Sequence, residues 1–522
     1  MSLVTKFASV GGATLASRVL GFVREALIGA ALGAGPIADA FYAAFAFPNL
    51  FRRLFAEGAF NSAFVPLFAK QIEAGGLDAA KAFAERVLSV LLVSLLALTG
   101  LAMVFMPQLA ASVIAPKFAD TPDKFAATVE LTRIMFPYLL CMSLVAMFSG
   151  ILNSMRRYFL AAIVPVLLNI ILPAAVLLAF WTGANAEQTG RYLAIAVFIS
   201  GFAQLFLMVF GVRRAGMSLA LVPPHLTPDV KRLLVLMGPA MLTGGVFQIN
   251  TLIGRIIASG QDGAIALLNY ADRINQLPLG VIGIAIGVVL LPELSRALKG
   301  GKPGEAEHLQ NRSLEFALAL TLPSAVAFLA MPGPLVNILY ERGAFTPETT
   351  ALTASALAAF ASGLPAYVLI KVVQPAYFAR EDMKTPMWFS FAAVAANIAL
   401  SLMLFGRFGH VAIALATSLS SWLNFMLLAG VLWWRGDFRP SATTWRRMVV
   451  IVAASLAVGL LMWQAQDLFA AAFASASLPM RIAATLGTLG AAAMFYLALV
   501  IGGGGVDRSE LTGLIARRRK KA

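Results

Sequence analysis

Charged residues are scarce in this chain, and residue types on which many enzymes and secreted proteins depend are almost missing. Lys, Arg, Asp and Glu make up 12% of the 522 residues, whereas a soluble domain carries about 25%. A single cysteine, Cys141, excludes an intrachain disulfide. The three histidines fall in separate predicted loops, which argues against a metal site. Since 60% of the residues are hydrophobic, the sequence predicts an all-α integral membrane protein that crosses the bilayer many times.

Several motifs are also absent, and each absence removes a class of function. The chain has no phosphate-binding loop of the form GxxxxGK[ST], so we expect no ATP hydrolysis. Arg18 and Arg24 interrupt the first apolar run, which disfavours a cleavable signal peptide. A membrane enzyme acting on polyprenyl diphosphates needs paired carboxylates for Mg²⁺ or a His or Ser nucleophile. No Asp-rich motif appears and no histidine lies in a predicted span beyond its first turn, so a transporter without cofactor is expected instead.

Apolar segments separated by charged residues or by Pro and Gly predict fourteen transmembrane helices. Several are longer than the roughly 20 residues that a span needs, so they should tilt or protrude. The predicted spans are residues 8–33, 36–70, 82–113, 126–153, 158–182, 190–213, 230–259, 263–297, 310–331, 348–379, 385–406, 409–434, 446–466 and 480–502.

The positive charge follows a topological pattern. Of the 40 lysines and arginines, 26 lie at the N-terminus, in the even-numbered loops or in the tail, and seven lie in or beside the odd-numbered loops. The positive-inside rule therefore places both termini in the cytoplasm, as an even number of helices requires. We assign the net charge of +15 and the run RRRKK at 517–521 to topology and to contact with anionic membrane lipids, with no nucleic-acid partner.

A weak internal repeat divides the chain. Four residues recur 228 positions later: Pro137, Arg156, Asn169 and Ile170 become Pro365, Lys384, Asn397 and Ile398. A shift of six helices keeps orientation, so the pattern indicates two parallel six-helix halves, an architecture of transporters; chance similarity between apolar segments is the alternative. The predicted domains are residues 1–214 (helices 1–6), 215–435 (helices 7–12), 436–502 (helices 13 and 14) and a basic cytoplasmic tail at 503–522.

Two adjacent arginines near the middle of the second span carry the functional argument. Arg52 and Arg53 cannot both reach a membrane surface from an unbroken helix of that length. Each arginine costs about 2.5–3.5 kcal/mol at mid-bilayer, so the pair implies a water-filled or protein-lined cavity. Glu57 lies four residues after Arg53 and can partly neutralise it, and Asn49 lies four residues before it.

The first span carries a second polar group. Ser17 and Arg24 are seven residues apart and share one helical face, while Arg18 and Glu25 share another. Both arginines can face one cavity only if the cavity wraps around the helix or if Gly21 allows a bend. The alternative is that either arginine sits at a helix end and reaches the membrane surface.

Further polar residues lie in the second and eighth spans. Asp39 opens the second span, where it is either an N-terminal helix cap or part of a gating ion pair. In the eighth span Asn269, Arg273 and Gln276 line one face with Asp272 beside it, although Asp272 and Arg273 could form a self-contained pair.

Arg255 and Lys371 are further candidates, but each can also be a residue near a helix end. Together the arginines outnumber the nearby carboxylates, so the cavity is predicted to be cationic. Because the planar fork of arginine matches two phosphate oxygens, the expected ligand is anionic and phosphorylated.

These motifs resemble the MurJ (MviN) family of lipid II flippases, in the multidrug/oligosaccharidyl-lipid/polysaccharide exporter superfamily. The resemblance rests on PNLFRRLFAEGAFNSAFVP at 48–66, ASRVLGFVRE at 16–25 and YADR at 270–273. It implies two six-helix lobes in a V that open alternately to either side of the bacterial inner membrane. It also implies a groove for the undecaprenyl tail formed by the two extra helices at 436–502, where small residues are frequent.

The resemblance gives the candidate residues their roles. It implies that lipid II, a diphosphate-linked disaccharide-peptide, passes from the inner to the outer leaflet. The candidate substrate-binding residues are Arg18, Arg24, Arg52, Arg53, Arg273, Asn49 and Ser17; the gating or charge-balancing residues are Asp39, Glu57, Glu25 and Asp272; further candidates are Arg255, Asn269, Gln276 and Lys371.

Some members of that family bind sodium through acidic and amide side chains in the C-terminal lobe. This chain departs from that pattern, because the comparable region carries Lys371 and Gln374. We therefore expect the membrane potential, ahead of sodium, to drive transport. The expected assembly is a monomer, with other cell-wall synthesis proteins as further partners.

Three alternatives to lipid II transport stay open. A drug or cation antiporter of the same superfamily should carry carboxylates in the cavity in place of arginines. A flippase for another polyprenyl-diphosphate glycan would share the cationic cavity. A scaffold without transport would leave the intramembrane arginines unexplained.

Overall fold

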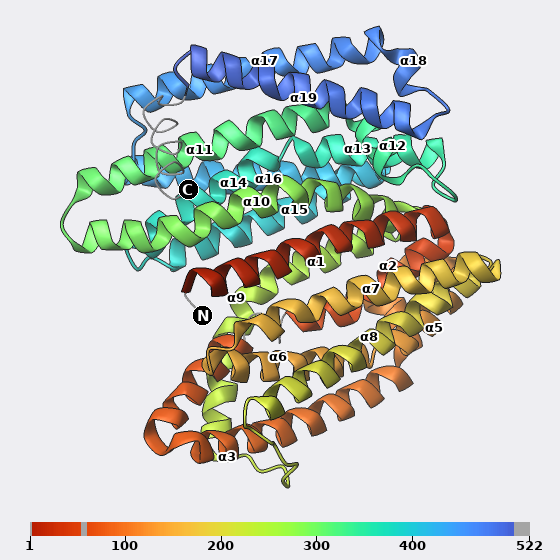
Figure 1. Cartoon of the computed structure of the whole chain (residues 1–522), viewed down its shortest axis with the longest axis vertical. Coiled ribbons are helices and arrows are strands. Elements are labelled where there is room, and N and C mark those ends of the chain that lie inside the picture. The colour runs from red at the N-terminus through yellow and green to blue at the C-terminus, as the bar shows by residue number, and fades with distance from the viewer. Residues whose placement is uncertain (1–2, 54–59, 506–522) are drawn as a thin grey trace. The chain divides into compact units, whose positions relative to one another are not determined.

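The structure is a computed structural model that describes residues 3–53 and 60–505. Within these ranges it does not describe the side chains of residues 3–15, 239–240, 242–244, 246–247, 281 and 283–289. Every regular element of the described chain is a helix, so the predicted all-α class is confirmed (Figure 1).

The helices follow one another with short connections. The elements are α1 (Leu3–Leu32), α2 (Pro36–Phe51), α3 (Phe60–Val104), α4 (Met106–Leu109), the π-helix η2 (Ala110–Ile114), the 3₁₀-helix η3 (Pro116–Asp120), α5 (Pro122–Met135), α6 (Tyr138–Ser154), α7 (Tyr158–Thr182), α8 (Ala186–Arg214), α9 (Pro228–Ala258), α10 (Ala264–Lys299), α11 (Pro303–Ala330), α12 (Pro332–Tyr340), α13 (Pro347–Ala361), α14 (Leu364–Phe378), α15 (Lys384–Phe408), α16 (His410–Arg435), α17 (Ala442–Leu468), α18 (Ala470–Phe473) and α19 (Leu478–Gly502).

The helix bounds test the predicted spans. Ten helical segments of the described chain are long and apolar enough to cross a membrane, so the count of fourteen stays a prediction. The span at 158–182 coincides with α7. The span at 36–70 is described as two pieces, α2 and the start of α3. The break expected between residues 70 and 82 is the pair Gly75 and Gly76, where α3 leaves helical geometry.

The predicted span at 82–113 is interrupted at Phe105, and two further predicted spans each divide into a pair of helices that together still form one candidate membrane span. The span at 126–153 divides into α5 and α6 at residues 136–137, and the span at 348–379 divides into α13 and α14 at 362–363. Pro137 stands in the first break, and Pro365 is the second residue of α14, just after the other break; proline suits both places because it cannot continue the hydrogen bonding of a preceding helix. Among the described residues, Arg156 and Glu381 are the two non-glycine residues with positive φ, and each lies in the turn after the second helix of its pair, although Glu381 is three residues out of the register of the repeat. The repeat stays a prediction.

The chain forms two compact units. The first contains residues 1–266 and 342–346, and the second contains 267–341 and 347–522. In the first unit α7 lies against both α1 and α8 (Figure 1). In the second, α15 packs on α16, and α17 packs on α11 and α19. The domain bounds derived from the repeat stay a prediction.

A buried carboxylate in the second unit fixes α17 to α11. Glu315 of α11 is 7% exposed. It accepts hydrogen bonds from the Thr444 hydroxyl at 2.7 Å and from Arg447 Nη1 at 2.9 Å, both on α17. Arg312 Nη1 lies 3.1 Å from the same carboxylate. Since a buried carboxylate needs such partners, this cluster sets the register of the two helices.

Candidate functional site

A buried polar network centres on Arg24 of α1. The residue is 6% exposed. Arg24 Nη1 donates to Asn169 Oδ1 of α7 at 2.8 Å, and Nη2 lies 2.5 Å from Glu25 Oε1. Tyr42 of α2 donates its hydroxyl to Glu25 Oε2 at 2.8 Å. Three helices thus hold one guanidinium within an otherwise apolar region, and Glu25 balances its charge.

The helical face that Ser17 and Arg24 were predicted to share lies against one amide side chain, that of Asn169. Asn169 Nδ2 donates to the Ser17 carbonyl at 2.8 Å and to the Ser17 hydroxyl at 3.2 Å. Gly21 lies between them, where an added methyl would come 3.4 Å from Asn169 Nδ2. This distance is an ordinary van der Waals contact, so the packing of α7 does not require glycine here. The bend expected at Gly21 is absent, since α1 continues through it as one helix from Leu3 to Leu32.

Arg18 and Arg24 occupy different environments. Arg18 is exposed, and within the described chain no acidic side chain pairs with it. Arg24 Nε is buried and also lacks a hydrogen-bond partner among the described residues. The two arginines thus differ in burial and in charge compensation, although both lie on the predicted polar helix.

Both arginines of the second pair lie directly after the last residue of α2. Arg52 is half-buried, and its Nε donates to Asn49 Oδ1 at 2.8 Å. Arg53 is exposed, and Glu57 lies outside the described residues. Tyr138 of α6 is buried.

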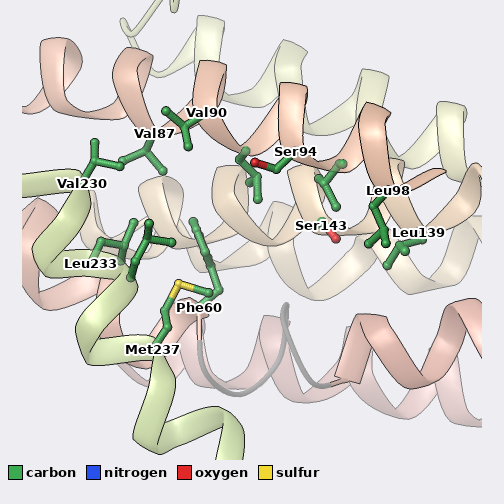
Figure 2. Close-up of a pocket in the computed structure, with 13 residues that line it drawn as sticks. Phe60, Val87, Val90, Ser94, Leu98, Leu139, Ser143, Val230, Leu233 and Met237 are labelled. Carbon is green, nitrogen blue, oxygen red and sulfur yellow. The ribbon is translucent and has the colours of Figure 1, made fainter. Parts of the chain in front are cut away.

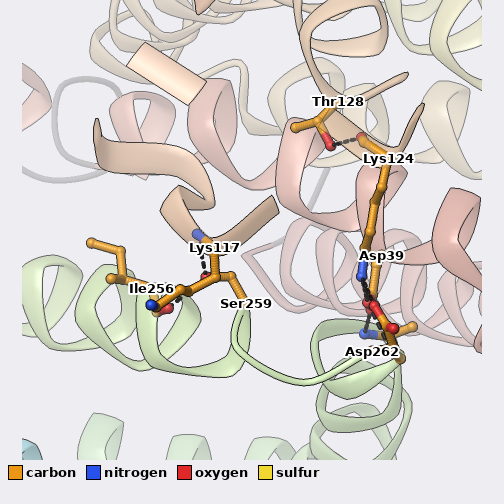
Figure 3. A network of polar contacts seen from close by, with 9 residues as sticks. Asp39, Lys117, Lys124, Thr128, Ile256, Ser259 and Asp262 are labelled. Atoms are coloured by element: carbon orange, nitrogen blue, oxygen red, sulfur yellow. Dashed lines mark hydrogen bonds and ion pairs between the residues drawn. The ribbon is translucent and has the colours of Figure 1, made fainter. Parts of the chain in front are cut away.

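Asp39 is both an ion-pair partner and a helix cap, but the helix it caps is not its own. The side chain is fully buried and lies 2.7 Å from Lys124 Nζ of α5 (Figure 3). It also accepts hydrogen bonds from the backbone N–H groups of Gly263 at 2.7 Å and Ala266 at 3.0 Å. These amides open α10, where the helix dipole favours a negative charge. Asp39 thus joins α2, α5 and the start of α10 inside the first unit.

Lys124 is a functional candidate that the sequence reading left out. Its side chain is 2% exposed, lies 2.8 Å from Asp262 Oδ1 and stands 4.0 Å from the centre of the Phe118 ring. In the count of positive charges, Lys124 is one of the seven lysines and arginines in or beside the odd-numbered loops. The only available signal was a carboxylate at the start of the second predicted span and a lysine just before the start of the fourth.

The polar face predicted on α10 is present in the second unit. Gln276 Nε2 donates to Asp272 Oδ2, four residues earlier. Asn269 and Arg273 are half-buried on the same helix. Because these residues and the arginines of α1 and α2 belong to different units, their convergence on one cavity stays a prediction.

The remaining candidates are Arg255 and Lys371. Arg255 is half-buried in the last turn of α9. Lys371 of α14 is exposed, and Gln374 is half-buried. Among the described residues, no cluster of three or more His, Cys, Asp or Glu side chains could hold a metal ion.

The small residues of the last two helices fall into two groups. Gly459 of α17 is buried, and an added methyl would meet Val326 of α11 at 2.4 Å, so this face serves close helix packing. Gly487 and Gly490 of α19 are exposed, and an added methyl there would have no neighbour within 4 Å. A groove for a lipid tail on this second face stays a prediction.

Comparison with solved structures places the fold in the class of multi-span membrane transporters. A structure titled lipid II flippase MurJ, inward closed conformation, aligns with a TM-score of 0.76 and 24% identity over 94% of this chain and 99% of that chain. An inward-facing multidrug resistance MATE family transporter aligns with a TM-score of 0.67 and 15% identity over 80% of this chain and 94% of that chain.

Sequence comparison identifies the family. The family model described as lipid II flippase MurJ matches residues 28–484. A probable lipid II flippase MurJ of Rhizobium tropici is 51% identical, covering 100% of this chain and 97% of the relative. The lipid II flippase MurJ of Burkholderia cenocepacia is 36% identical, covering 89% and 90%. The chain belongs to the lipid II flippase MurJ family, which confirms the resemblance found in its motifs.

Proposed function

We infer that this chain is a lipid II flippase acting in peptidoglycan biosynthesis. Membership of the family and the names of full-length relatives support this function. In finer detail, we propose that the lipid passes from the inner to the outer leaflet of the cytoplasmic membrane through alternating access, with both termini in the cytoplasm.

The proposed mechanism rests on one observation, which is that Glu25 neutralises the charge of Arg24. A carboxylate offers the guanidinium two oxygen acceptors, as a phosphate does. Glu25 therefore occupies, in the described arrangement, one of the positions that a diphosphate oxygen would take. We propose that substrate entry exchanges this carboxylate for phosphate, while Asn169 keeps the guanidinium oriented from α7.

The test measures flipping of fluorescent lipid II by purified protein in vesicles. Replacing Arg24 by Ala should lower the rate about 10- to 100-fold, because a hydrogen bond to a charged group is worth roughly 1.5–3 kcal/mol. Arg24→Lys should recover part of it, since lysine lacks the fork. Asn169→Leu should raise the lipid II concentration needed for half-maximal flipping more than it lowers the flipping rate at saturating lipid II.

Controls separate function from folding. Arg24→Ala leaves Glu25 buried without its guanidinium, so the double variant Arg24→Ala, Glu25→Gln is the better test of function in a folded protein. Arg191→Ala removes an exposed arginine that pairs with Glu130 and Glu187, and should leave the rate unchanged. Normal flipping by the folded double variant would refute the role of Arg24.

We propose the membrane potential as the energy source. A diphosphate carries about two negative charges, and one charge moved through 100 mV is worth about 2.3 kcal/mol. An inside-negative potential would therefore favour outward passage by up to about 4–5 kcal/mol. Flipping in vesicles clamped with potassium and valinomycin, with and without sodium, tests this. If sodium removal stops flipping while collapse of the potential does not, the proposal fails.

A further inference from the structure

A cavity of about 180 Å³ lies between α3, α6 and α9 in the first unit, apart from the arginine network (Figure 2). Its walls are almost wholly aliphatic. Two serines, Ser94 and Ser143, stand among leucines and valines and leave space that larger side chains would fill. The lining includes Val87, Leu91 and Leu95 of α3, Leu139 of α6, and Leu233 and Met237 of α9.

The dimensions of this cavity match one leaflet of a bilayer. The lining follows α3 from Val87 to Leu98, about 16 Å at the helical rise of 1.5 Å per residue. Half of a hydrocarbon core of about 30 Å is about 15 Å. The cavity lies along a helix that is long and apolar enough to span a membrane. A hydrocarbon chain of a single leaflet is therefore the occupant that fits in both length and polarity.

One end of the cavity carries three exposed cations. Lys231 and Arg232 directly follow Val230 at the start of α9, and Arg86 directly precedes Val87 on α3. In Figure 2, Val87, Val230 and Leu233 lie at one end of the cavity, and Ser143 and Leu98 lie at the other. These three cations outnumber the two neighbouring carboxylates, Glu85 and Asp229, beside the end of the cavity where the head group of a lipid would stand if its chain occupied the cavity.

We propose that this cavity binds one acyl chain of an anionic phospholipid, whose phosphate is held by Arg86, Lys231 and Arg232. The bound lipid would fill the space between α9 and the pair α3 and α6, and so stabilise the packing of α9. The site is separate from the arginines assigned to lipid II and does not depend on the flippase function.

The experiment uses full-length protein in vesicles that contain phosphatidylglycerol with a diazirine near the end of one acyl chain. Crosslinks mapped by mass spectrometry should concentrate on Leu91, Leu95 and Leu139. Leu91→Trp and Val90→Trp should fill the cavity and reduce these crosslinks. Val93→Trp and Leu96→Trp, on the exposed face of the same helix, are matched controls that should not.

Charge variants test the head-group contact without filling the cavity. Lys231→Ala and Arg232→Ala should each lower labelling roughly fivefold, since a basic residue near an anionic surface contributes about that factor in affinity. Arg213→Ala is the control at an exposed arginine outside the cavity. A phosphatidylcholine with the same diazirine chain should label the cavity more weakly.

Three results would overturn the proposal. Equal labelling of the lining and of the face that contains Val93 and Leu96 would mean bulk lipid only. Equal labelling by the two head groups would remove the role of the cations. Displacement by unlabelled undecaprenyl diphosphate, with no displacement by phosphatidylglycerol, would assign the cavity to a polyprenyl chain.

Discussion

Replacing Lys124 by Met gives a sharp test of the buried ion pair that joins α2, α5 and the start of α10. Methionine keeps the approximate length of the lysine chain and removes only the charge. The change leaves Asp39 fully buried, with the backbone N–H groups of Gly263 and Ala266 as its remaining hydrogen-bond donors. A carboxylate in that position has lost its counter-charge in a region of low dielectric constant.

The structure sets the expected magnitude. Removing one partner of a buried pair costs about 3–5 kcal/mol, and the two backbone donors place Lys124→Met near the lower value. Asp39→Asn should cost less, about 1.5–3 kcal/mol, because Lys124 keeps Asp262 at 2.8 Å. The double variant should be more stable than the sum of the two losses predicts, since it leaves no unpaired buried charge.

The assay is the folded fraction of purified protein as sodium dodecyl sulfate is titrated into dodecyl maltoside micelles, which gives a free energy of unfolding for each variant. Lys81→Met is the matched control, because Lys81 is 42% exposed and lies 3.8 Å from Glu85. Its effect should stay within about 0.5 kcal/mol. A loss for Lys124→Met no larger than this control, or strict additivity in the double variant, would refute the reasoning.

Two further predictions concern the second unit. Hydrogen bonds from Arg435 and then from Thr385 lower the pKa of Asp382 from its usual 3.8 to about 2. The ionised carboxylate therefore stabilises the fold above pH 3.8, and this contribution is lost as the pH falls towards 2. In the same titration, the difference in stability between wild type and Asp382→Asn should shrink over that pH range. Gly363→Ala should lower stability by about 1–3 kcal/mol, because the added methyl would lie 2.5 Å from Ser418 Oγ; Gly430→Ala in α16 is the control and should be neutral or slightly stabilising, since no atom lies within 4 Å.

Local signals explain which helices the sequence could predict. The bounds of α7 were predicted because Arg157 precedes a long, mostly apolar run and Gly183 ends it in the left-handed conformation. The breaks at 136–137 and 362–363 were missed because apolar residues continue on both sides, so periodicity alone shows no boundary. The proline that marks each break had been noticed only as part of the repeat.

Hydrophobic periodicity could not predict which residues pair with one another across different helices. The sequence placed Ser17 and Arg24 on one face, but it could not show that Asn169, 145 residues after Arg24, lies against that face. Asn169 had been recorded only as a repeat position, although an amide in the middle of an apolar helix is itself a signal for an interhelical contact. Lys124 was missed for the same reason, since a single helical pattern does not identify the neighbouring helix.

The compensation of Arg24 also changes the expected response to voltage. Counting the predicted arginines alone suggests that an empty cavity carries several positive charges and is strongly pulled by the potential. Glu25 cancels one of these charges in the described arrangement, at 2.5 Å from the guanidinium. Each cancelled charge removes about 2.3 kcal/mol per 100 mV from that pull. Glu25 stays on α1 when a diphosphate displaces it, so the loaded carrier differs from the empty one by the two negative charges of the diphosphate, worth about 4–5 kcal/mol per 100 mV. If passage of the loaded carrier and return of the empty one show the same voltage dependence, the diphosphate does not cross the potential as an uncompensated anion, and the proposed energy source is wrong.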